Sequence, residues 1–237
     1  MVRPTELRGA DRLIVALDVS SHEEALSLVD RLDNVSLFKI GLQLFLTGHI
    51  LNLIKKIQDS RRGGGGVFLD LKLGGDIGNT IGSLVKDCRG LNVKFITLVQ
   101  AEPHSLTIET LKRARAARGA DPYPCILMVP LLSSMTEPGA AAKILERGET
   151  LLEWGSDGLI VSGPEIGPCR TRFPEALLVS PGIRPDGSFH DDHLRFTTPS
   201  EAVRLGSDYL VVGRPITQHP DPRAAAQAII DEVNGAL

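Results

Sequence analysis

The chain has 237 residues, of which 42% are hydrophobic and 23% charged, and its formal net charge is −3. This composition is typical of a globular protein with a sizeable core, and the balance of 26 Lys and Arg against 29 Asp and Glu leaves no electrostatic footprint for nucleic acid or an anionic membrane. Seven Phe, two Tyr and one Trp are too few for the stacking platforms that hold single-stranded nucleic acid, so we expect aliphatic side chains to fill the core.

The three cysteines, Cys88, Cys125 and Cys169, are widely separated in the sequence. Their spacing fits neither a disulfide framework nor a paired-cysteine zinc site, which favours a reducing compartment. The N-terminal sequence MVRPTELRGADR has no apolar segment typical of a signal peptide, and the longest apolar runs are too short to span a bilayer. We therefore expect a cytoplasmic protein without a membrane partner.

Short apolar runs alternate along the chain with longer stretches that have helical spacing. The expected strands are residues 13–19, 36–40, 67–71, 94–99, 125–131, 158–161, 176–180 and 209–212. The clearest expected helices are residues 21–32, 42–57, 106–117, 140–154 and 223–233. This alternation is typical of βαβ units, and eight of them predict an α/β protein with a single (β/α)8 TIM barrel over residues 1–237. A doubly wound sheet is the alternative.

Charged residues gather where three successive strands are expected to end. They are Asp18 at the end of the first strand, Lys39 at the end of the second, and Asp70, Lys72 and Asp76 at and beyond the end of the third. Active sites of TIM barrels lie at the carboxyl ends of the strands, and alternating opposite charges there offset part of the cost of removing each from water. A catalytic cluster is therefore favoured over salt bridges that merely close the barrel.

Glycine and arginine follow the last two expected strands, in the segments SPGIRPDG and VVGRPIT. The loops at these positions often bind phosphate in TIM barrels. Gly182 and Gly213 would let backbone N–H groups approach an oxyanion, and Arg184 and Arg214 could bind it with paired hydrogen bonds. The sequence therefore predicts a phosphorylated substrate.

Two other conspicuous segments have simpler interpretations. The glycine-rich run at residues 61–66 precedes the third strand, on the side of a barrel opposite to its ligands, and we interpret it as a flexible turn. The HDDH run at residues 190–193 has no partner set with zinc spacing, so we interpret it as a solvated loop or a lid and predict no metal site.

Taken together, these segments resemble the bacterial type of the orotidine 5′-phosphate decarboxylase family. The resemblance is carried, in the family's order, by LIVALDV, FKIG, FLDLKLGGDIGNT, LLSSM, GSDGLIVS, SPGIRPDG and GSDYLVVGRPITQHPDP. It covers nearly the whole chain and implies decarboxylation of orotidine 5′-phosphate to uridine 5′-phosphate, the last step of pyrimidine nucleotide synthesis, without a cofactor.

The resemblance also implies roles for individual residues. Asp18 and Lys39 would hold the ribose hydroxyls, with Lys39 also in the catalytic network. Asp70 would face the substrate carboxylate, and Lys72 would protonate carbon 6 of the pyrimidine. The remaining implied site residues are Asp76 and Thr80, which would reach across a homodimer interface; Ser133 and Ser134 at the pyrimidine; and Arg184, His193, Gly213 and Arg214 at the phosphate.

This chain departs from the family pattern at two of these places. Gly74 and Gly75 stand between Leu73 and Asp76, which adds one residue to the usual D-x-K-x-x-D spacing, and the pair could absorb it as a bulge. His193 stands where a glutamine is usual, so phosphate affinity would depend on pH near neutrality.

Two other functions remain open from the sequence. One is a related sugar-phosphate decarboxylase or aldolase on the same barrel, which would use magnesium. The other is a homologue that binds uridine 5′-phosphate but has lost catalysis through the extra glycine.

Overall fold

The computed structural model describes residues 7–60, 65–74, 78–101, 103–132, 139–186 and 196–237. Eight parallel strands form a closed barrel in chain order, with β1 also paired to β8. The strands are β1 Leu13–Ala16, β2 Leu37–Gly41, β3 Gly66–Gly74, β4 Val93–Val99, β5 Cys125–Val129, β6 Gly158–Ile160, β7 Leu177–Ser180 and β8 Tyr209–Val212. The predicted TIM barrel is confirmed, and the alternative of a doubly wound sheet is wrong.

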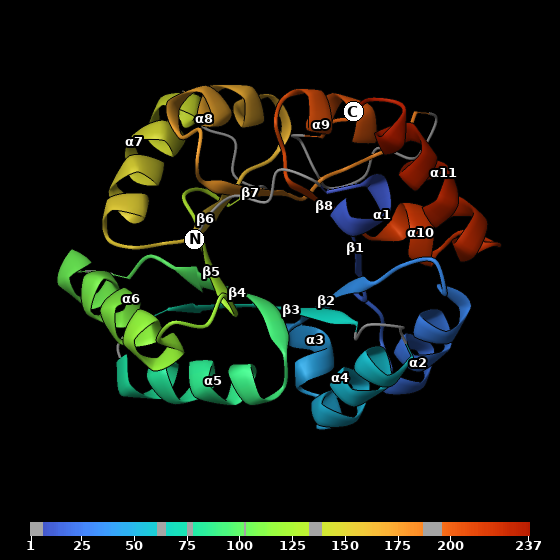
Figure 1. Cartoon of the computed structure of the whole chain (residues 1–237), viewed down its shortest axis with the longest axis horizontal. Helices are drawn as coiled ribbons and strands as arrows, with labels where there is room; N and C mark the ends of the chain where they lie inside the picture. The colour runs from blue at the N-terminus through green and yellow to red at the C-terminus, as the bar shows by residue number, and fades with distance from the viewer. Residues whose placement is uncertain (1–6, 61–64, 75–77, 102, 133–138, 187–195) are drawn as a thin grey trace.

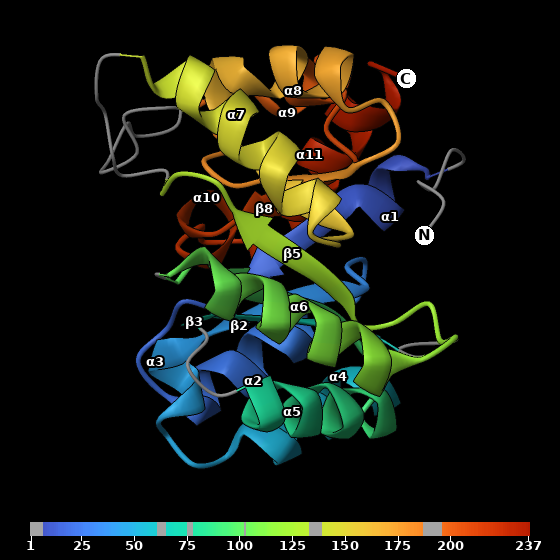
Figure 2. The same cartoon turned by 90° about the vertical axis from the view of Figure 1, so that its left-hand side faces the viewer.

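Helices surround the barrel on its outside (Figure 1). They are α1 Gly9–Arg12, α2 His22–Arg31, α3 Leu42–Phe45, α4 Ile50–Asp59, α5 Gly78–Gly90, α6 His104–Arg118, α7 Ala140–Glu153, α8 Ile166–Arg172, α9 Pro199–Arg204, α10 Arg214–Thr217 and α11 Pro222–Asn234, with a 3-10 turn at Gly163–Glu165. Figure 2 shows α5 and α6 packed side by side along the outside of the barrel. At the junction of the two chain ends, α1 contacts α11.

The core has two layers, because successive side chains of a strand point to opposite faces. In β1, Leu13 and Val15 pack under the helices, whereas Ile14 and Ala16 belong to the layer inside the barrel. The inner layer also holds an aromatic stack in which Phe95 contacts Phe68 and Tyr209 edge-on, with ring centroids 5.8 and 5.0 Å away. Most side chains of the outer layer are aliphatic, as expected, although Phe38 and Phe173 also belong to it, and aromatic rings help to fill the barrel interior.

The predicted helix at residues 42–57 is wrong as a single element. It is divided into α3 and α4 by residues 46–49, where Gly48 has a left-handed backbone with φ 77° and Thr47 donates a hydrogen bond to the carbonyl of Leu44. Glycine reaches this conformation without steric cost, and it redirects the chain. The predicted start of α2 is confirmed, because the hydroxyl of Ser21 accepts a hydrogen bond from the backbone of Glu24 at 3.1 Å.

The longest strand, β3, is irregular near its carboxyl end. Between the pairs Leu69–Ile96 and Leu73–Leu98, β3 advances four residues while β4 advances two. Lys72 lies within this interval and has a left-handed backbone with φ 48°, which is uncommon for a residue other than glycine. Gly74 lies beyond it and pairs with Val99. The described irregularity therefore precedes the glycine pair, where we expected a bulge.

At the amino ends of the strands, two aspartates with buried side chains bind across the barrel wall. Asp208 accepts hydrogen bonds from Arg170 at 2.7 Å and from the backbone N–H of Leu178 at 2.9 Å. Asp157 does the same with Arg118 and with the backbone N–H of Ile126. Each aspartate thus joins its own strand to a neighbouring strand and to a helix.

Within the described part of the chain, no helix is both long and apolar enough to cross a membrane.

Candidate active site

A cavity of about 450 Å³ opens at the carboxyl ends of the strands. It is lined by eight of the residues singled out from the sequence: Asp18, Lys39, Asp70, Lys72, Gly182, Arg184, Gly213 and Arg214. The apolar part of the wall is made by side chains such as Phe68, Val129 and Ile160. The fold therefore brings the predicted charge cluster and the predicted phosphate loops to one cavity.

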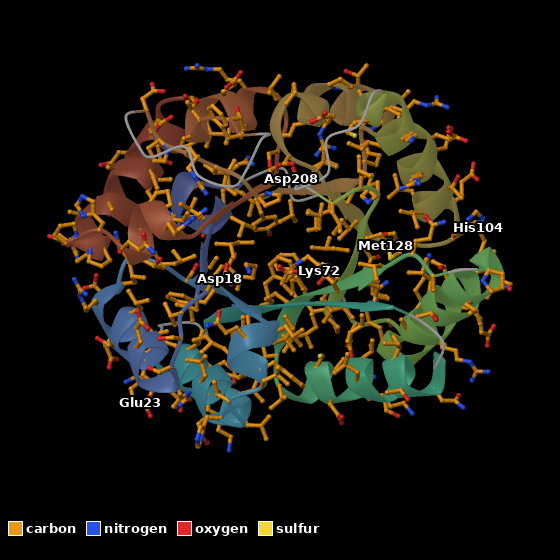
Figure 3. The ribbon with its side chains drawn as sticks, turned by 180° about the vertical axis from the view of Figure 1, so that it is seen from behind. Asp18, Glu23, Lys72, His104, Met128 and Asp208 are labelled. Atoms are coloured by element: carbon orange, nitrogen blue, oxygen red, sulfur yellow. The ribbon has the colours of Figure 1, made fainter. Side chains whose placement is uncertain are left out.

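Four charged side chains form an alternating chain along one wall. Lys39 Nζ lies 2.9 Å from Asp18 Oδ1 and 3.3 Å from Asp70 Oδ2, and Lys72 Nζ lies 2.9 Å from Asp70 Oδ1. The two inner members are buried, with 11% of the Lys39 side chain and 12% of the Asp70 side chain exposed, whereas Asp18 and Lys72 are open to the cavity. Figure 3 shows Asp18 and Lys72 inside the ring of helices.

The buried pair remains ionised despite its removal from water. Burial by itself would raise the pKa of Asp70, but the ammonium groups of Lys39 and Lys72 and hydrogen bonds from Lys72 and Thr97 lower it below its ordinary value. Burial would lower the pKa of Lys39, but the carboxylates of Asp70 and Asp18 raise it above its ordinary value. Because each charge is stabilised by its neighbours, the cavity presents fixed charges at neutral pH.

Another wall of the cavity is cationic and rich in backbone turns. Arg184 is buried, and its guanidinium donates to its neighbour's carbonyl, Ile183 O, at 3.0 Å. The turn is held by Arg184 N–H bonded to Thr197 O at 3.0 Å, and Gly182 has φ 75°. Gly213 and Arg214 follow β8, at the start of the short helix α10. Two arginines that line the same cavity are suited to an anion with several oxygens, such as a phosphate.

Comparison with known proteins agrees with this arrangement. Residues 11–229 match the model of the family described as orotidine 5′-phosphate decarboxylase / HUMPS. The chain belongs to this family. Orotidine 5′-phosphate decarboxylases of Rhodopseudomonas palustris and Bradyrhizobium diazoefficiens are 42% and 40% identical to it, over 100% and 99% of this chain and 99% and 98% of theirs.

Solved structures of family members have the same fold. The orotidine 5′-phosphate decarboxylase of Lactobacillus acidophilus is 30% identical and superposes with a TM-score of 0.76, covering 94% of this chain and 98% of its own. That of Pyrococcus horikoshii is 26% identical with a TM-score of 0.73, covering 94% and 99%. The prediction that the chain is a carboxy-lyase is confirmed by these family relationships.

One predicted site residue of this family member lies away from the cavity. Thr80 is on α5, where it lines a separate apolar hollow of about 320 Å³ with Leu42, Phe45, Leu73 and other side chains. Within one chain, Thr80 therefore does not line the wall that carries Lys72.

Four predicted site residues, Asp76, Ser133, Ser134 and His193, lie outside the described residues, as does the HDDH run. Among the residues that are described, no three His, Cys, Asp or Glu side chains are placed so that they could hold a metal ion.

Three polar residues at or next to the cavity were missed by the sequence reasoning. Thr217 and Gln218 line it next to Arg214. Thr97 donates a hydrogen bond to Asp70 from the neighbouring strand β4. The available signal for Thr97 was its position as the one hydroxyl residue in the apolar run FITLV.

Proposed function

We propose that this chain converts orotidine 5′-phosphate to uridine 5′-phosphate and carbon dioxide, the last step of pyrimidine nucleotide synthesis. Membership of the family supports this substrate, and so do the relatives that bear the name of that activity. The observation that carries the proposal is the alternating chain Asp18–Lys39–Asp70–Lys72 in the same cavity as Arg184 and Arg214.

In this proposal the cationic wall binds the phosphate and the charge chain binds the rest of the nucleotide. Arg184, Arg214 and the backbone at Gly213 would hold the phosphate, and Asp18 with Lys39 would hold the ribose hydroxyls. Binding energy from the remote phosphate would keep the pyrimidine against Asp70 and Lys72, so the two arginines would assist catalysis by positioning the substrate.

The chemical step needs a cation where negative charge develops. The bond between carbon 6 and the carboxylate breaks, carbon dioxide leaves, and the electron pair stays on carbon 6. The ammonium of Lys72, already held by Asp70 at 2.9 Å, would stabilise this charge and then give its proton to carbon 6. Solvent would return a proton to Lys72, so each turnover consumes one proton. This step requires no electron sink beyond the protein's own charges, and we propose no cofactor.

We also propose that the active unit is a homodimer with the active sites at its interface. The apolar hollow that contains Thr80 is bordered by exposed apolar side chains, including Leu42 at 55% and Phe45 at 39%. Burial of such a surface against a second copy would remove it from water and bring Asp76 and Thr80 towards the partner's cavity. Sedimentation analysis is expected to give a dimer, and Leu42→Asp is expected to yield monomers with reduced turnover.

The cytoplasm is the proposed compartment. The three cysteines are buried and form no disulfide, and burial raises the pKa of Cys88 and Cys125 to about 12 and that of Cys169 to about 11. Thiols with such pKa values are protonated and unreactive at neutral pH, as suits structural cysteines in a reducing environment. Cell fractionation of the expressed protein would test this.

The deciding experiment for the reaction is an ultraviolet assay with orotidine 5′-phosphate, whose absorbance differs from that of the product. Turnover that survives treatment with a chelator is expected. Chelator-sensitive turnover of a different sugar phosphate would favour the related magnesium-dependent function. Binding of uridine 5′-phosphate by calorimetry without any turnover would indicate a homologue that has lost catalysis.

A further inference from the structure

Thr97 is a buried polar side chain in the wall of the barrel. Its neighbours Ile96 and Leu98 pack in the outer core layer, so alternation along β4 directs Thr97 towards the barrel interior. It is 1% exposed, and a hydroxyl this deeply buried is costly unless it is hydrogen-bonded. Its partners therefore determine what it does.

The Thr97 hydroxyl makes hydrogen bonds to two members of the charge chain. Oγ1 lies 3.0 Å from the backbone nitrogen of Lys72 and 2.9 Å from Asp70 Oδ1. An N–H group can only donate, so Oγ1 must accept from Lys72. An ionised carboxylate can only accept, so the hydroxyl proton must be given to Asp70. The hydroxyl oxygen accepts one of these hydrogen bonds and the hydroxyl proton is donated in the other, so both can exist together.

The bond to Lys72 forms where the ladder between β3 and β4 is irregular. The regular register between these strands is lost between Leu69 and Leu73, and Lys72 has its left-handed backbone in this interval. An uncommon backbone conformation of this kind persists only where its surroundings hold it. The Thr97 hydroxyl supplies an acceptor for the Lys72 N–H at this position, and so it holds the backbone from which the ammonium projects.

The bond to Asp70 acts on the other member of the reacting pair. Asp70 is faced by Lys39 from β2, by Lys72 from its own strand and by Thr97 from β4, with Asp18 beyond Lys39. Lys72 Nζ lies 2.9 Å from both carboxylate oxygens, and Lys39 Nζ lies 3.3 Å from Oδ2. The bond from Thr97 fixes the plane of the carboxylate from the side of the barrel wall.

We infer that Thr97 is a positioning residue for the proposed decarboxylation. Its single hydroxyl holds the Asp70 carboxylate and the Lys72 backbone in fixed positions relative to each other. The inference rests on the proposed function. It assigns to Thr97 no contact with the substrate, so removal of the hydroxyl should affect the reaction more than the binding of a nucleotide.

The test uses two pairs of variants that differ in the hydroxyl group. Thr97→Val replaces the hydroxyl by a methyl group of similar size, and Thr97→Ala differs from Thr97→Ser in the same group. Thr97→Val loses hydrogen bonds to a charged group and to a backbone amide, so its kcat is expected to be about 10- to 100-fold below that of the wild type. For the same reason, Thr97→Ala is expected to have a lower kcat than Thr97→Ser. Thr97→Ser should restore most of the activity. Thr110→Val, at a buried threonine of α6 away from the cavity, is the matched control and should keep the wild-type rate.

Two further measurements separate positioning from a loss of structure. The Kd for uridine 5′-phosphate should stay near that of the wild type in Thr97→Val. The acid limb of the profile of kcat/KM against pH should move to higher pH, because the hydrogen bond from Thr97 helps to lower the pKa of Asp70. The second ionisation of the substrate phosphate also contributes to this limb but is common to all variants.

The possible results distinguish a positioning role of Thr97 from a structural one, and both from failure of the proposed function. An unchanged kcat in Thr97→Val, or equal rates in the Ala and Ser variants, would overturn the inference while the proposed function stood. Equal losses of kcat and of nucleotide affinity would show a purely structural role. If Thr97→Val does not fold, the Ala and Ser pair carries the test. A wild-type protein without turnover would overturn the proposed function itself, and the inference with it.

Discussion

The two ends of the barrel both contain buried charges, but they arrange them differently. At the amino ends of the strands, Asp208 binds Arg170 and a strand amide, and its side chain is 0% exposed. At the carboxyl ends, Asp70 is shared between Lys39 and Lys72, and Lys72 opens into the cavity. The first arrangement pairs each carboxylate with an arginine and a backbone N–H, whereas the second places two cations on one carboxylate.

The two arrangements are suited to different roles, the first to stabilising the barrel and the second to catalysis. An arginine bound in several directions is a fixed cross-link, and Arg170 also donates to the carbonyls of Gly206, Phe173, Pro174 and Ala176. A lysine is a compact charge that can transfer a proton, and two of them around one aspartate leave one ammonium available to a substrate. The amino-terminal charges are thus expected to hold the barrel together, and the carboxyl-terminal ones to react.

The largest effect should follow replacement of Lys72. Lys72→Ala removes both the cation beside the developing charge and the proton donor, so kcat is expected to fall by at least about 10⁴-fold. The free energy of unfolding should change little, because the side chain is partly exposed and Asp70 keeps Lys39. The ultraviolet assay and urea unfolding measure the two quantities. A rate within tenfold of wild type, about 1.4 kcal/mol in the barrier, would contradict the role assigned to Lys72.

The opposite outcome is expected at the other end of the barrel. Asp208→Ala leaves the guanidinium of Arg170, whose side chain is only 15% exposed, without its carboxylate and the Leu178 amide without an acceptor. The free energy of unfolding should fall by about 3 to 5 kcal/mol, as when one partner of a buried ion pair is removed. The fraction that remains folded should keep its turnover number. A variant of normal stability with reduced kcat would reverse our assignment of the two ends.

The pH dependence of stability should sharpen the comparison. The pKa of Asp70 is lowered by folding, so its contribution to stability is full above its unfolded pKa of about 3.9 and is lost as the pH falls through the folded value. The pKa of Lys39 is raised, so its contribution is full below its unfolded pKa of about 10.4 and is lost as the pH rises through the folded value.

The stability difference between wild type and Asp70→Asn should therefore be constant from about pH 5 to 9 and shrink below about pH 4. Chemical unfolding at several pH values would measure it. A difference that persisted undiminished in acid would show that ionisation of Asp70 is not its source.

The smallest effect is expected at an exposed ion pair. Arg223 Nε lies 2.6 Å from Asp33 Oδ1, but more than half of each side chain is exposed. Asp33→Ala should change the free energy of unfolding by less than about 1 kcal/mol and leave turnover unchanged, which makes it the matched control for Asp208→Ala. A larger loss would mean that charge pairs stabilise this barrel wherever they lie.

The sequence predicts much of the fold because its signals are local. Apolar runs such as residues 209–212 define their strands without reference to distant partners, and the charged ends of β1 to β3 meet because parallel strands end at one rim. The break between α3 and α4 could have been suspected from Gly48, yet the apolar spacing continues across it.

Contacts between strands were harder to predict because they depend on register. The hydrogen bonds of Thr97 follow from the irregular pairing of β3 with β4, which no periodicity encodes. The motif Gly-Ser-Asp occurs twice, directly before β6 and directly before β8. In the structure, both copies have a left-handed glycine, Gly155 and Gly206, followed by the aspartate that binds an arginine and a neighbouring strand.

The left-handed backbone of Lys72 bears on how this protein can evolve. Glycine adopts that conformation without strain, so a substitution of Lys72 by glycine would relieve the strain. The same substitution would remove the ammonium group. Selection for thermal robustness and selection for turnover would therefore act in opposite directions on a single codon. Engineering for stability should leave residue 72 fixed and seek its gains among the helices that surround the barrel.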